Sequence, residues 1–187
     1  MRRSIALLAL ATVLLLLAGG AGFSQDASLA ISEKATVVDG VVKADEYSFT
    51  RDFGQLKLYL NRSADTLWIG VVGATTGWVA VGLGSQRMDA ATIFMGFVDA
   101  AGKVQFKPQV GSGHSHQDLR AKDVTDSIVS YAMKEANGKT TLELALKAGT
   151  WVKKGQAALD LIFSVGGQDS FAPRHSYRGA LEVKLAQ

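Results

Sequence analysis

The chain has 187 residues, with 20 Lys and Arg, 17 Asp and Glu, three His and no Cys. This is the length of one ordinary domain with room for a sizeable core. The absence of Cys excludes disulfide bonds, thiolate-bound zinc, iron–sulfur clusters, a cysteine nucleophile and covalently attached c-type haem. The sequence also lacks a Gly-x-Ser-x-Gly elbow, a His-Glu-x-x-His motif and a phosphate-binding loop, so we expect a protein that is not an enzyme.

Residues 1–24 have the order of a secretory signal peptide. Arg2 and Arg3 precede an apolar run from Ile5 to Ala18, and small residues follow it. The run ends short of the roughly twenty apolar residues that a membrane anchor needs. We therefore expect cleavage before Gln25 and a periplasmic or secreted protein with no membrane span. Without the two leader arginines, 18 basic residues face 17 acidic ones, which gives no indication of nucleic-acid binding.

After residue 25 the sequence consists of short alternating runs separated by turn residues, without a sustained helical period. We assign 25–34 to an N-terminal segment and 35–187 to one domain. About eleven short strands predict an all-β fold, a two-sheet β-sandwich. The predicted strands are Ala35–Val38, Tyr47–Asp52, Gln55–Asn61, Thr66–Val72, Trp78–Leu83, Ala91–Val98, Val104–Gln109, Ser127–Glu135, Thr140–Lys147, Ala157–Val165 and Arg178–Leu185.

The clearest predicted hairpin joins Ser127–Glu135 to Thr140–Lys147 through Asn137-Gly138. Asn-Gly suits the positive φ angles of a tight hairpin turn. The second strand alternates leucines with more polar residues, so one of its faces is expected to be buried.

The region from Thr66 to Gln86 contains no charged residue, and its predicted strands are apolar on both faces. Turn residues from Gly73 to Gly77 interrupt the region, which argues against a transmembrane helix. Two interpretations stay open. The strands are central ones whose outer face is covered by loops, or they also line an apolar ligand pocket.

Several blocks of the sequence carry a resemblance to a known family. Val38-Asp39-Gly40 and Glu46-Tyr47 come first, followed by Leu67-Trp68-Ile69-Gly70 and by Gly77-Trp78-Val79-Ala80-Val81-Gly82-Leu83-Gly84. Met88, the block 91–99, Gly102-Lys103-Val104, His175 and Arg178-Gly179 continue the pattern. Together they resemble the DOMON domain over roughly residues 35–185, although the section from Lys122 to Gln156 matches only in pattern.

The resemblance implies an immunoglobulin-like β-sandwich of about 10–11 strands that lies outside the cytoplasm and binds haem or a sugar. In cytochrome members, such as the cytochrome domain of cellobiose dehydrogenase, haem b is held by a Met after the glycine turn and a His near the C-terminus. Met88 and His175 match these two ligands. The resemblance therefore implies non-covalent haem b with both residues on its iron. We expect the two loops at the same end of the sandwich, with Trp78 and Phe94 as apolar walls.

The residue types are consistent with these two ligands. Met88 follows a glycine turn between two charged residues, whereas Met95 and Met133 alternate with apolar neighbours and are interpreted as core. His175 lies in a loop just before the last predicted strand. Imidazole nitrogen and thioether sulfur are suitable axial ligands of haem iron. From position alone, a solvent-exposed Met88 and His175 are the alternative.

Basic residues surround the candidate histidine ligand. Arg174 and Arg178 flank it at short distance in the sequence and can pair with haem propionates, since guanidinium suits carboxylates. Tyr177 completes the candidate set of haem-contacting residues. The alternative for the two arginines is ordinary solvated charge.

His114 and His116 form a weaker candidate metal site. Two imidazoles at positions i and i+2 can share one strand face and chelate copper, nickel or zinc. Gly111 and Gly113 precede the pair, which makes the loop flexible, and no acidic third ligand is adjacent, so a structural role for these histidines stays open as well.

Three functions follow from these features. The leading hypothesis is an exported b-type cytochrome domain that transfers single electrons to or from a redox partner protein or a small-molecule electron carrier. The second is a haem-free module that binds carbohydrate or another small ligand by stacking on Trp68, Trp78 or Trp151. The third is a copper-binding protein that uses His114 and His116.

Overall fold

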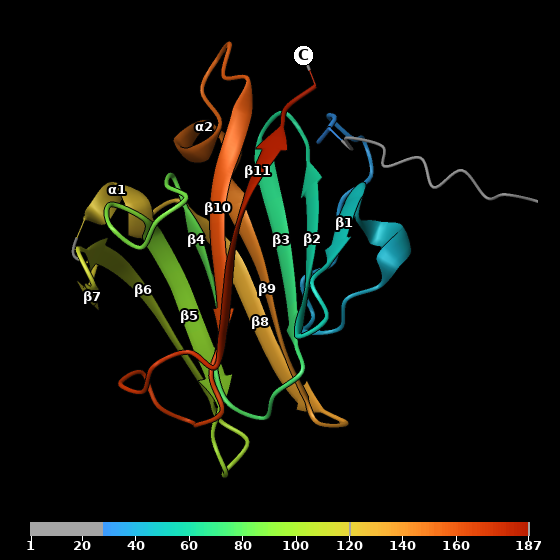
Figure 1. Cartoon of the computed structure of the whole chain (residues 1–187). Helices are drawn as coiled ribbons and strands as arrows, with labels where there is room; N and C mark the ends of the chain where they lie inside the picture. Colours follow the sequence, from blue (N-terminus) through green and yellow to red (C-terminus); the bar gives the residue numbers. More distant parts are fainter. Residues whose placement is uncertain (1–27, 120, 187) are drawn as a thin grey trace, which may run out of the picture.

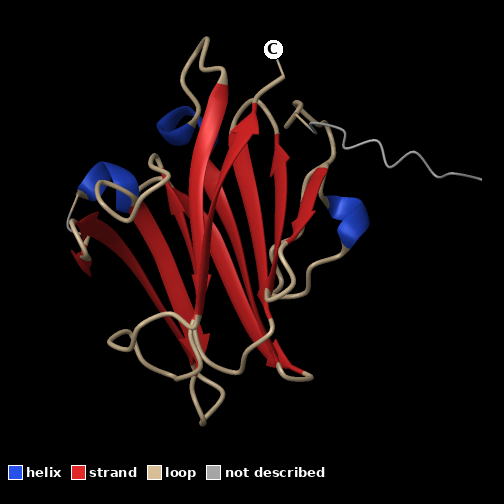
Figure 2. Cartoon of the chain, viewed as in Figure 1, coloured by secondary structure: helices blue, strands red, loops and turns tan. Residues whose placement is uncertain are grey.

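The computed structural model describes residues 28–119 and 121–186, which form a two-layer sandwich of antiparallel sheets, seen in Figure 1 and, by secondary structure, in Figure 2. The order is β1-β2-β3-β9-β8 in the five-stranded sheet and β11-β10-β4-β5-β6-β7 in the six-stranded sheet. The predicted two-sheet β-sandwich is therefore confirmed. The expected signal peptide and its cleavage position lie outside the described residues.

The five-stranded sheet consists of β1 (Phe49–Asp52), β2 (Leu56–Arg62), β3 (Thr66–Gly73), β8 (Ile128–Ala136) and β9 (Lys139–Lys147). The six-stranded sheet consists of β4 (Val79–Leu83), β5 (Thr92–Val98), β6 (Val104–Ser112), β7 (Ser115–Asp118), β10 (Ala158–Val165) and β11 (Tyr177–Lys184). Three short helices are η1 (Ala44–Glu46), α1 (Lys122–Thr125) and α2 (Ala148–Trp151). Within the described part of the chain, no helix is long and apolar enough to cross a membrane.

The main core lies between the two sheets and follows from the alternation in the sequence. Inward-facing leucines of β2 and β9 meet the inward-facing valines and Leu83 of β4. Phe94 of β5 and Phe163 of β10 are the largest side chains fully buried there. Each such side chain contributes about 1.5–3 kcal/mol relative to an exposed one.

Ten of the eleven predicted strands are present, most with ends shifted by one or two residues. The predicted strand Ala35–Val38 is wrong, because this segment forms no ladder with a neighbouring strand. Strand β7 was not predicted, because the glycines before His114 indicated a loop. The structure has a hairpin there, in which Ser112 pairs with Ser115. The hairpin through Asn137 and Gly138 is confirmed, with φ of 53° and 70° at its two turn residues.

Residues 34–47, here called the N-terminal crossover, cover the outer face of the five-stranded sheet. Tyr47 packs there against Trp68 of β3 and Ala145 of β9, with Val38 and Val42 at the edge of this cluster. The crossover therefore hides apolar side chains that the sheet would otherwise expose to water.

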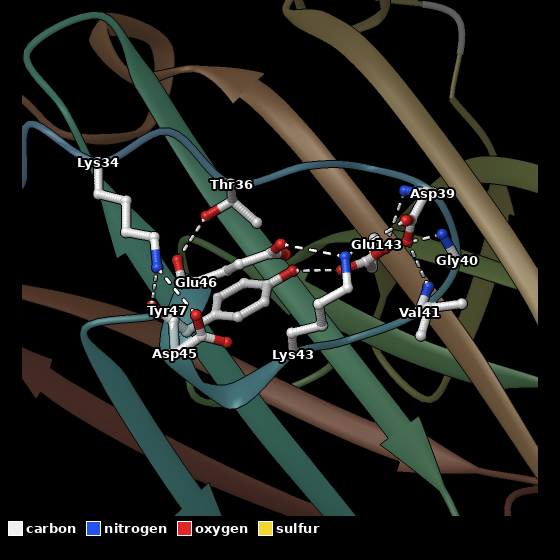
Figure 3. Close-up of polar contacts among 10 residues, drawn as sticks. All are labelled: Lys34, Thr36, Asp39, Gly40, Val41, Lys43, Asp45, Glu46, Tyr47 and Glu143. Carbon is white, nitrogen blue, oxygen red and sulfur yellow. Dashed lines mark hydrogen bonds and ion pairs between the residues drawn. The ribbon is translucent and has the colours of Figure 1, made fainter.

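A buried carboxylate holds the N-terminal crossover in place. Glu143 of β9 is fully buried, at 0% exposure, and accepts hydrogen bonds from Tyr47 Oη at 2.7 Å, Gly40 N at 2.7 Å and Asp39 N at 3.1 Å (Figure 3). Gly40 has φ of +82°, a conformation that favours glycine. Burial, together with the hydrogen bond to Glu143, raises the pKa of Tyr47 far above its ordinary value, so the phenol remains a donor.

We predict that Glu143→Gln destabilises the fold, because an amide cannot accept all three hydrogen bonds and leaves buried donors unpaired. The free energy of unfolding, measured by urea denaturation, is expected to fall by about 1–3 kcal/mol. The control is Glu135→Gln on the exposed surface of β8, which is expected to stay within about 0.5 kcal/mol of the parent protein. Equal stability of the two variants would contradict the role of Glu143.

Candidate functional site on the outer face of the six-stranded sheet

The six-stranded sheet is apolar on its outer face as well as on its core face. Its outer-face cluster consists of the buried residues Trp78, Ala80, Ala91, Ile93, Met95 and Phe97, against which Met88, Ile162 and Phe171 pack. The cluster is separate from the core between the sheets. Met95 therefore belongs to the outer face, whereas the sequence interpretation assigned it to the core; Met133 does lie in the core. Loops cover the outer-face cluster, as one of the two sequence interpretations required.

Small residues occupy the centre of this outer face. Ala80 and Gly82 of β4 point outward between the larger side chains of β5 and β10, since Ala80 pairs with Met95 and Gly82 with Ile93. A Cβ at Gly82 would stand 2.5 Å from the Cγ1 of Ile162, so the Ile162 side chain packs directly over this glycine. The small residues of β4 therefore leave room for the Ile162 side chain to pack within the outer-face cluster.

The loop that carries Met88 rests on the β6–β7 hairpin. A Cβ at Gly111 would overlap the carbonyl oxygen of Met88, so only glycine allows this approach. Ala90 N donates to Gly111 O at 3.1 Å, and Gly113 N donates to Asp89 Oδ1 at 2.8 Å. These contacts fix Met88 over the sheet, where its half-buried side chain packs into the outer-face cluster.

Residues 166–176, here called the His175 loop, cover the other end of the outer face. A Cβ at Gly166 would overlap the indole of Trp78, so only glycine at this position leaves room for the indole ring. Phe171 lies with its ring centroid 4.9 Å from that of Phe97. The indole Nε1 of Trp78 is buried and has no hydrogen-bond partner within the described residues.

A polar hollow of about 360 Å³ adjoins the apolar cluster at β6 and β7. Phe171 forms one wall, and Lys107 Nζ lies 5.2 Å from its ring centroid and 3.2 Å from Asp118 Oδ2. Gln109 Oε1 and His116 Nδ1 are buried there without a hydrogen-bond partner in the described part of the chain. These two atoms can bond to a ligand that enters the hollow.

The predicted haem-contacting residues divide into three groups. Met88 and Trp78 lie together in the outer-face cluster. Arg178 lies on the same face, because it pairs with Ser164, which pairs with Ala80. Arg174 and His175 are exposed in the His175 loop. Within residues 28–119 and 121–186, no hydrogen bond or ion pair engages their side chains.

The third group faces the interior. Phe94 is fully buried between the sheets, and Tyr177 packs against the same core. The expectation that Phe94 and Trp78 wall one pocket is therefore wrong, because successive side chains of a strand point to opposite faces and these two lie on different faces of the sheet.

Met88 and His175 approach the outer face from opposite ends, and the expectation of a common end is wrong. Leu83 and Thr92, which bracket the Met88 loop, pair with each other at one end of β4. Val79, at the other end, pairs with Val165, and Val165 pairs with Tyr177, two residues after His175. The two loops are thus separated by the length of β4, about 13 Å at 3.3 Å per residue.

The histidine pair is split by the hairpin turn. His114 is exposed in the turn, whereas His116 of β7 is half-buried and borders the polar hollow. No group of three or more His, Cys, Asp or Glu residues that suits a metal ion occurs in the described residues.

Sequence reasoning missed three contributors to this surface. Phe171 was the one large apolar residue in a polar loop, which was a usable signal. Gly111 and Gln109 gave no signal, because their roles depend on which loop lies over them. Of the proposed stacking tryptophans, Trp68 is buried under the N-terminal crossover and Trp78 in the outer-face cluster.

Comparison with solved structures returns cytochrome domains. The cytochrome b domain of pyranose dehydrogenase from Coprinopsis cinerea matches with a TM-score of 0.54 and 12% identity, covering 74% of this chain and 81% of that chain. The cytochrome domain of Myriococcum thermophilum cellobiose dehydrogenase matches with a TM-score of 0.54, 11% identity and the same coverages, 74% and 81%. A family 9 carbohydrate-binding module from Caldicellulosiruptor kristjanssonii, in complex with glucose, matches with a TM-score of 0.49 and 14% identity, covering 85% of this chain and 95% of that chain.

The chain has the fold of these cytochrome b domains. Identities of 11–12% show the fold alone, and at that level the resemblance drawn from the sequence is confirmed. No protein-family model matches the chain, and no curated protein does.

We predict that Gly166→Ala disturbs the outer face by displacing the indole of Trp78. The expected cost is about 1–3 kcal/mol of stability, as for other overpacked sites, together with a shift in tryptophan fluorescence. Gly167→Ala is the matched control, since a Cβ there meets no atom within 4 Å. Thermal unfolding of both variants measures the difference in stability. A loss of stability in the control alone would refute the role of Gly166 in making room for the indole of Trp78.

Proposed function

We propose that this protein is an exported b-type cytochrome domain that binds haem b without covalent attachment on the outer face of the six-stranded sheet. The observation that carries the proposal is the outer-face cluster itself. An apolar surface on the far side of a sandwich sheet is unusual, and this one is bracketed by a methionine loop and a histidine loop. A porphyrin is a flat, largely apolar group and needs an apolar surface to pack against.

The chemistry of the two bracketing loops fits the group. Met88 packs its side chain against the cluster, and His175 is exposed in the loop at the other end of the face. Under the proposal, these two side chains would hold the haem. Coordination of one iron requires the imidazole to lie over the outer face. When bound, haem would supply a one-electron redox centre, held through the thioether of Met88 and the imidazole of His175. We therefore propose electron transfer and no catalysis.

The charged residues near the face suit the propionates. Arg178 lies on the outer face in the same row as Ala80 and Met95, and Arg174 belongs to the His175 loop. Guanidinium groups bind carboxylates in bidentate geometry. The unpartnered Nε1 of Trp78 is a further donor at the edge of the apolar surface. Tyr177 and Phe94 face the core on the other side of the sheet, so they are not expected to contact the haem.

The setting of this activity follows from the sequence. The sequence of residues 1–24 supports this setting, because it has the order of a secretory signal peptide, and we propose a periplasmic or secreted location on that ground. The partner is then a redox protein or a small-molecule electron carrier outside the cytoplasm, and neither nucleic acid nor a membrane span is part of the proposal.

The visible spectrum of the purified chain after haem addition tests this proposal. We expect a sharp Soret band and split α and β bands on reduction. His175→Ala should lose most of the bound haem, and Met88→Ala should lose less. Met88→His should keep the haem and lower the reduction potential, because a second imidazole replaces the thioether that favours reduced iron.

The control is the double variant His114→Ala with His116→Ala, which should keep its haem and its spectrum. A protein that stays colourless would remove the proposal. Loss of the Soret band in the double variant, with retention in His175→Ala, would assign the iron-binding imidazole to His114 or His116 instead.

A second candidate function is a haem-free module for carbohydrate, favoured by the polar hollow between β6, β7 and the His175 loop. Its aromatic wall is Phe171, and its unpartnered buried atoms, Gln109 Oε1 and His116 Nδ1, suit the hydroxyl groups of a neutral sugar. Lys107 and Asp118 form an ion pair there, which leaves the lining close to neutral.

Titration of the haem-free protein with glucose, followed by NMR, tests this second function. Saturable shifts that Phe171→Ala abolishes and that Val129→Ala, an exposed change on β8, leaves intact would support it. The absence of any shift at high glucose concentration would exclude glucose and argue against the sugar function.

A further inference from the structure

One charged side chain lies buried at the end of the sandwich without a counter-ion. Arg62, the last residue of β2, continues the inward row of Leu56, Leu58 and Leu60, and is 7% exposed. Its Nη2 donates to the carbonyl oxygen of Ala186 at 2.8 Å. Its Nε is buried without a hydrogen-bond partner, and no carboxylate pairs with it in the described residues.

A hollow of about 270 Å³ opens beside this guanidinium, at the end of the sandwich where α2 and the last residues of β11 lie (Figure 1). Lys153 and Lys154 also line it, and none of its lining residues is acidic. Lys153 Nζ donates to Gly149 O at 2.9 Å, which keeps this ammonium at the hollow. Three cationic side chains therefore line this hollow, and no carboxylate of the described residues lines it.

Such an arrangement is costly without a ligand. Burial disfavours the charged form and lowers the pKa of Arg62 from its ordinary value, yet a guanidinium remains charged in proteins. Removing a charge from water costs several kcal/mol unless a counter-charge and hydrogen bonds compensate. Folded proteins keep buried polar groups satisfied, so an unsatisfied donor at a hollow indicates a missing partner.

We propose that this hollow, defined by Arg62, Lys153 and Lys154, binds a small oxyanion, a phosphate or sulfate group. A guanidinium fork and two ammonium groups are the donors that proteins use for such groups. The volume is at the small end of ligand sites, which suits one tetrahedral anion better than an extended molecule. The inference does not depend on haem, because the hollow lies at the end of the sandwich and shares no residue with the outer-face cluster.

The experiment is a calorimetric titration of the full chain with inorganic phosphate, with sodium chloride at equal ionic strength as the blank. We expect saturable binding by the parent protein, and an NMR shift of the Arg62 Nε–H signal on saturation. Arg62→Met should weaken binding at least about tenfold, because it removes the charge-assisted hydrogen bonds. In phosphate-free buffer the same variant should be as stable as the parent or more so.

A second pair of variants guards against a folding defect in Arg62→Met. Lys153→Gln with Lys154→Gln changes two exposed residues and should weaken phosphate binding, whereas Lys134→Gln with Lys139→Gln, exposed on β8 and β9, should not. Sedimentation with phosphatidylglycerol vesicles, against phosphatidylcholine vesicles, separates the sources of the anion. Binding to the first alone, lost in Arg62→Met, identifies a lipid headgroup, and binding of free phosphate alone identifies a small solute.

The proposal is overturned if neither phosphate nor phosphatidylglycerol binds saturably. It is equally overturned if both lysine double variants weaken binding to the same extent, since that would show a general effect of net charge.

Discussion

The whole sandwich depends on one constraint, which is that β3 in one sheet and β4 and β5 in the other are apolar on their outer faces as well as toward the core. Each outer face therefore needs a cover, and the chain supplies both covers from its own connecting segments. The N-terminal crossover lies on the five-stranded sheet. The Met88 loop and the His175 loop lie on the six-stranded sheet.

The two covers differ in how they are held. The N-terminal crossover is fixed by Glu143, a fully buried carboxylate with three short hydrogen bonds. The cover of the six-stranded sheet rests on contacts made possible by glycines, Gly111 under Met88 and Gly166 under Trp78. The Phe171 ring completes this cover by packing against the ring of Phe97. Backbone hydrogen bonds also hold this cover, from Ala90 N to Gly111 O and from Gly166 N to Trp78 O, but within the described residues no buried charged side chain takes part in it as Glu143 does in the other.

The sequence predicted most of the fold because alternation of apolar residues is a local property, as in β9 and in the turn at Asn137-Gly138. It failed where a long-range contact decides the outcome. Ala35–Val38 alternates like a strand, but the backbone that follows it binds Glu143 of a distant strand. Met95 alternates like a core residue, yet period-2 alternation cannot say which of two apolar faces is the inner one. Gly111 and Gln109 matter only because the Met88 and His175 loops come to lie nearby.

The same topology explains why Met88 and His175 belong to opposite ends of the outer face. Strands β4 and β10 are antiparallel neighbours. The connection that follows β4 therefore starts at one end of the sheet, and the connection that follows β10 starts at the opposite end. The Met88 loop follows β4 and the His175 loop follows β10. Two loops on antiparallel neighbours therefore reach over one face in opposite directions. A ligand bound on this face, as we propose, would lie between the two loops. The separation that contradicts a common end of the sandwich thus favours a shared face, and the small residues Ala80 and Gly82 lie midway along it.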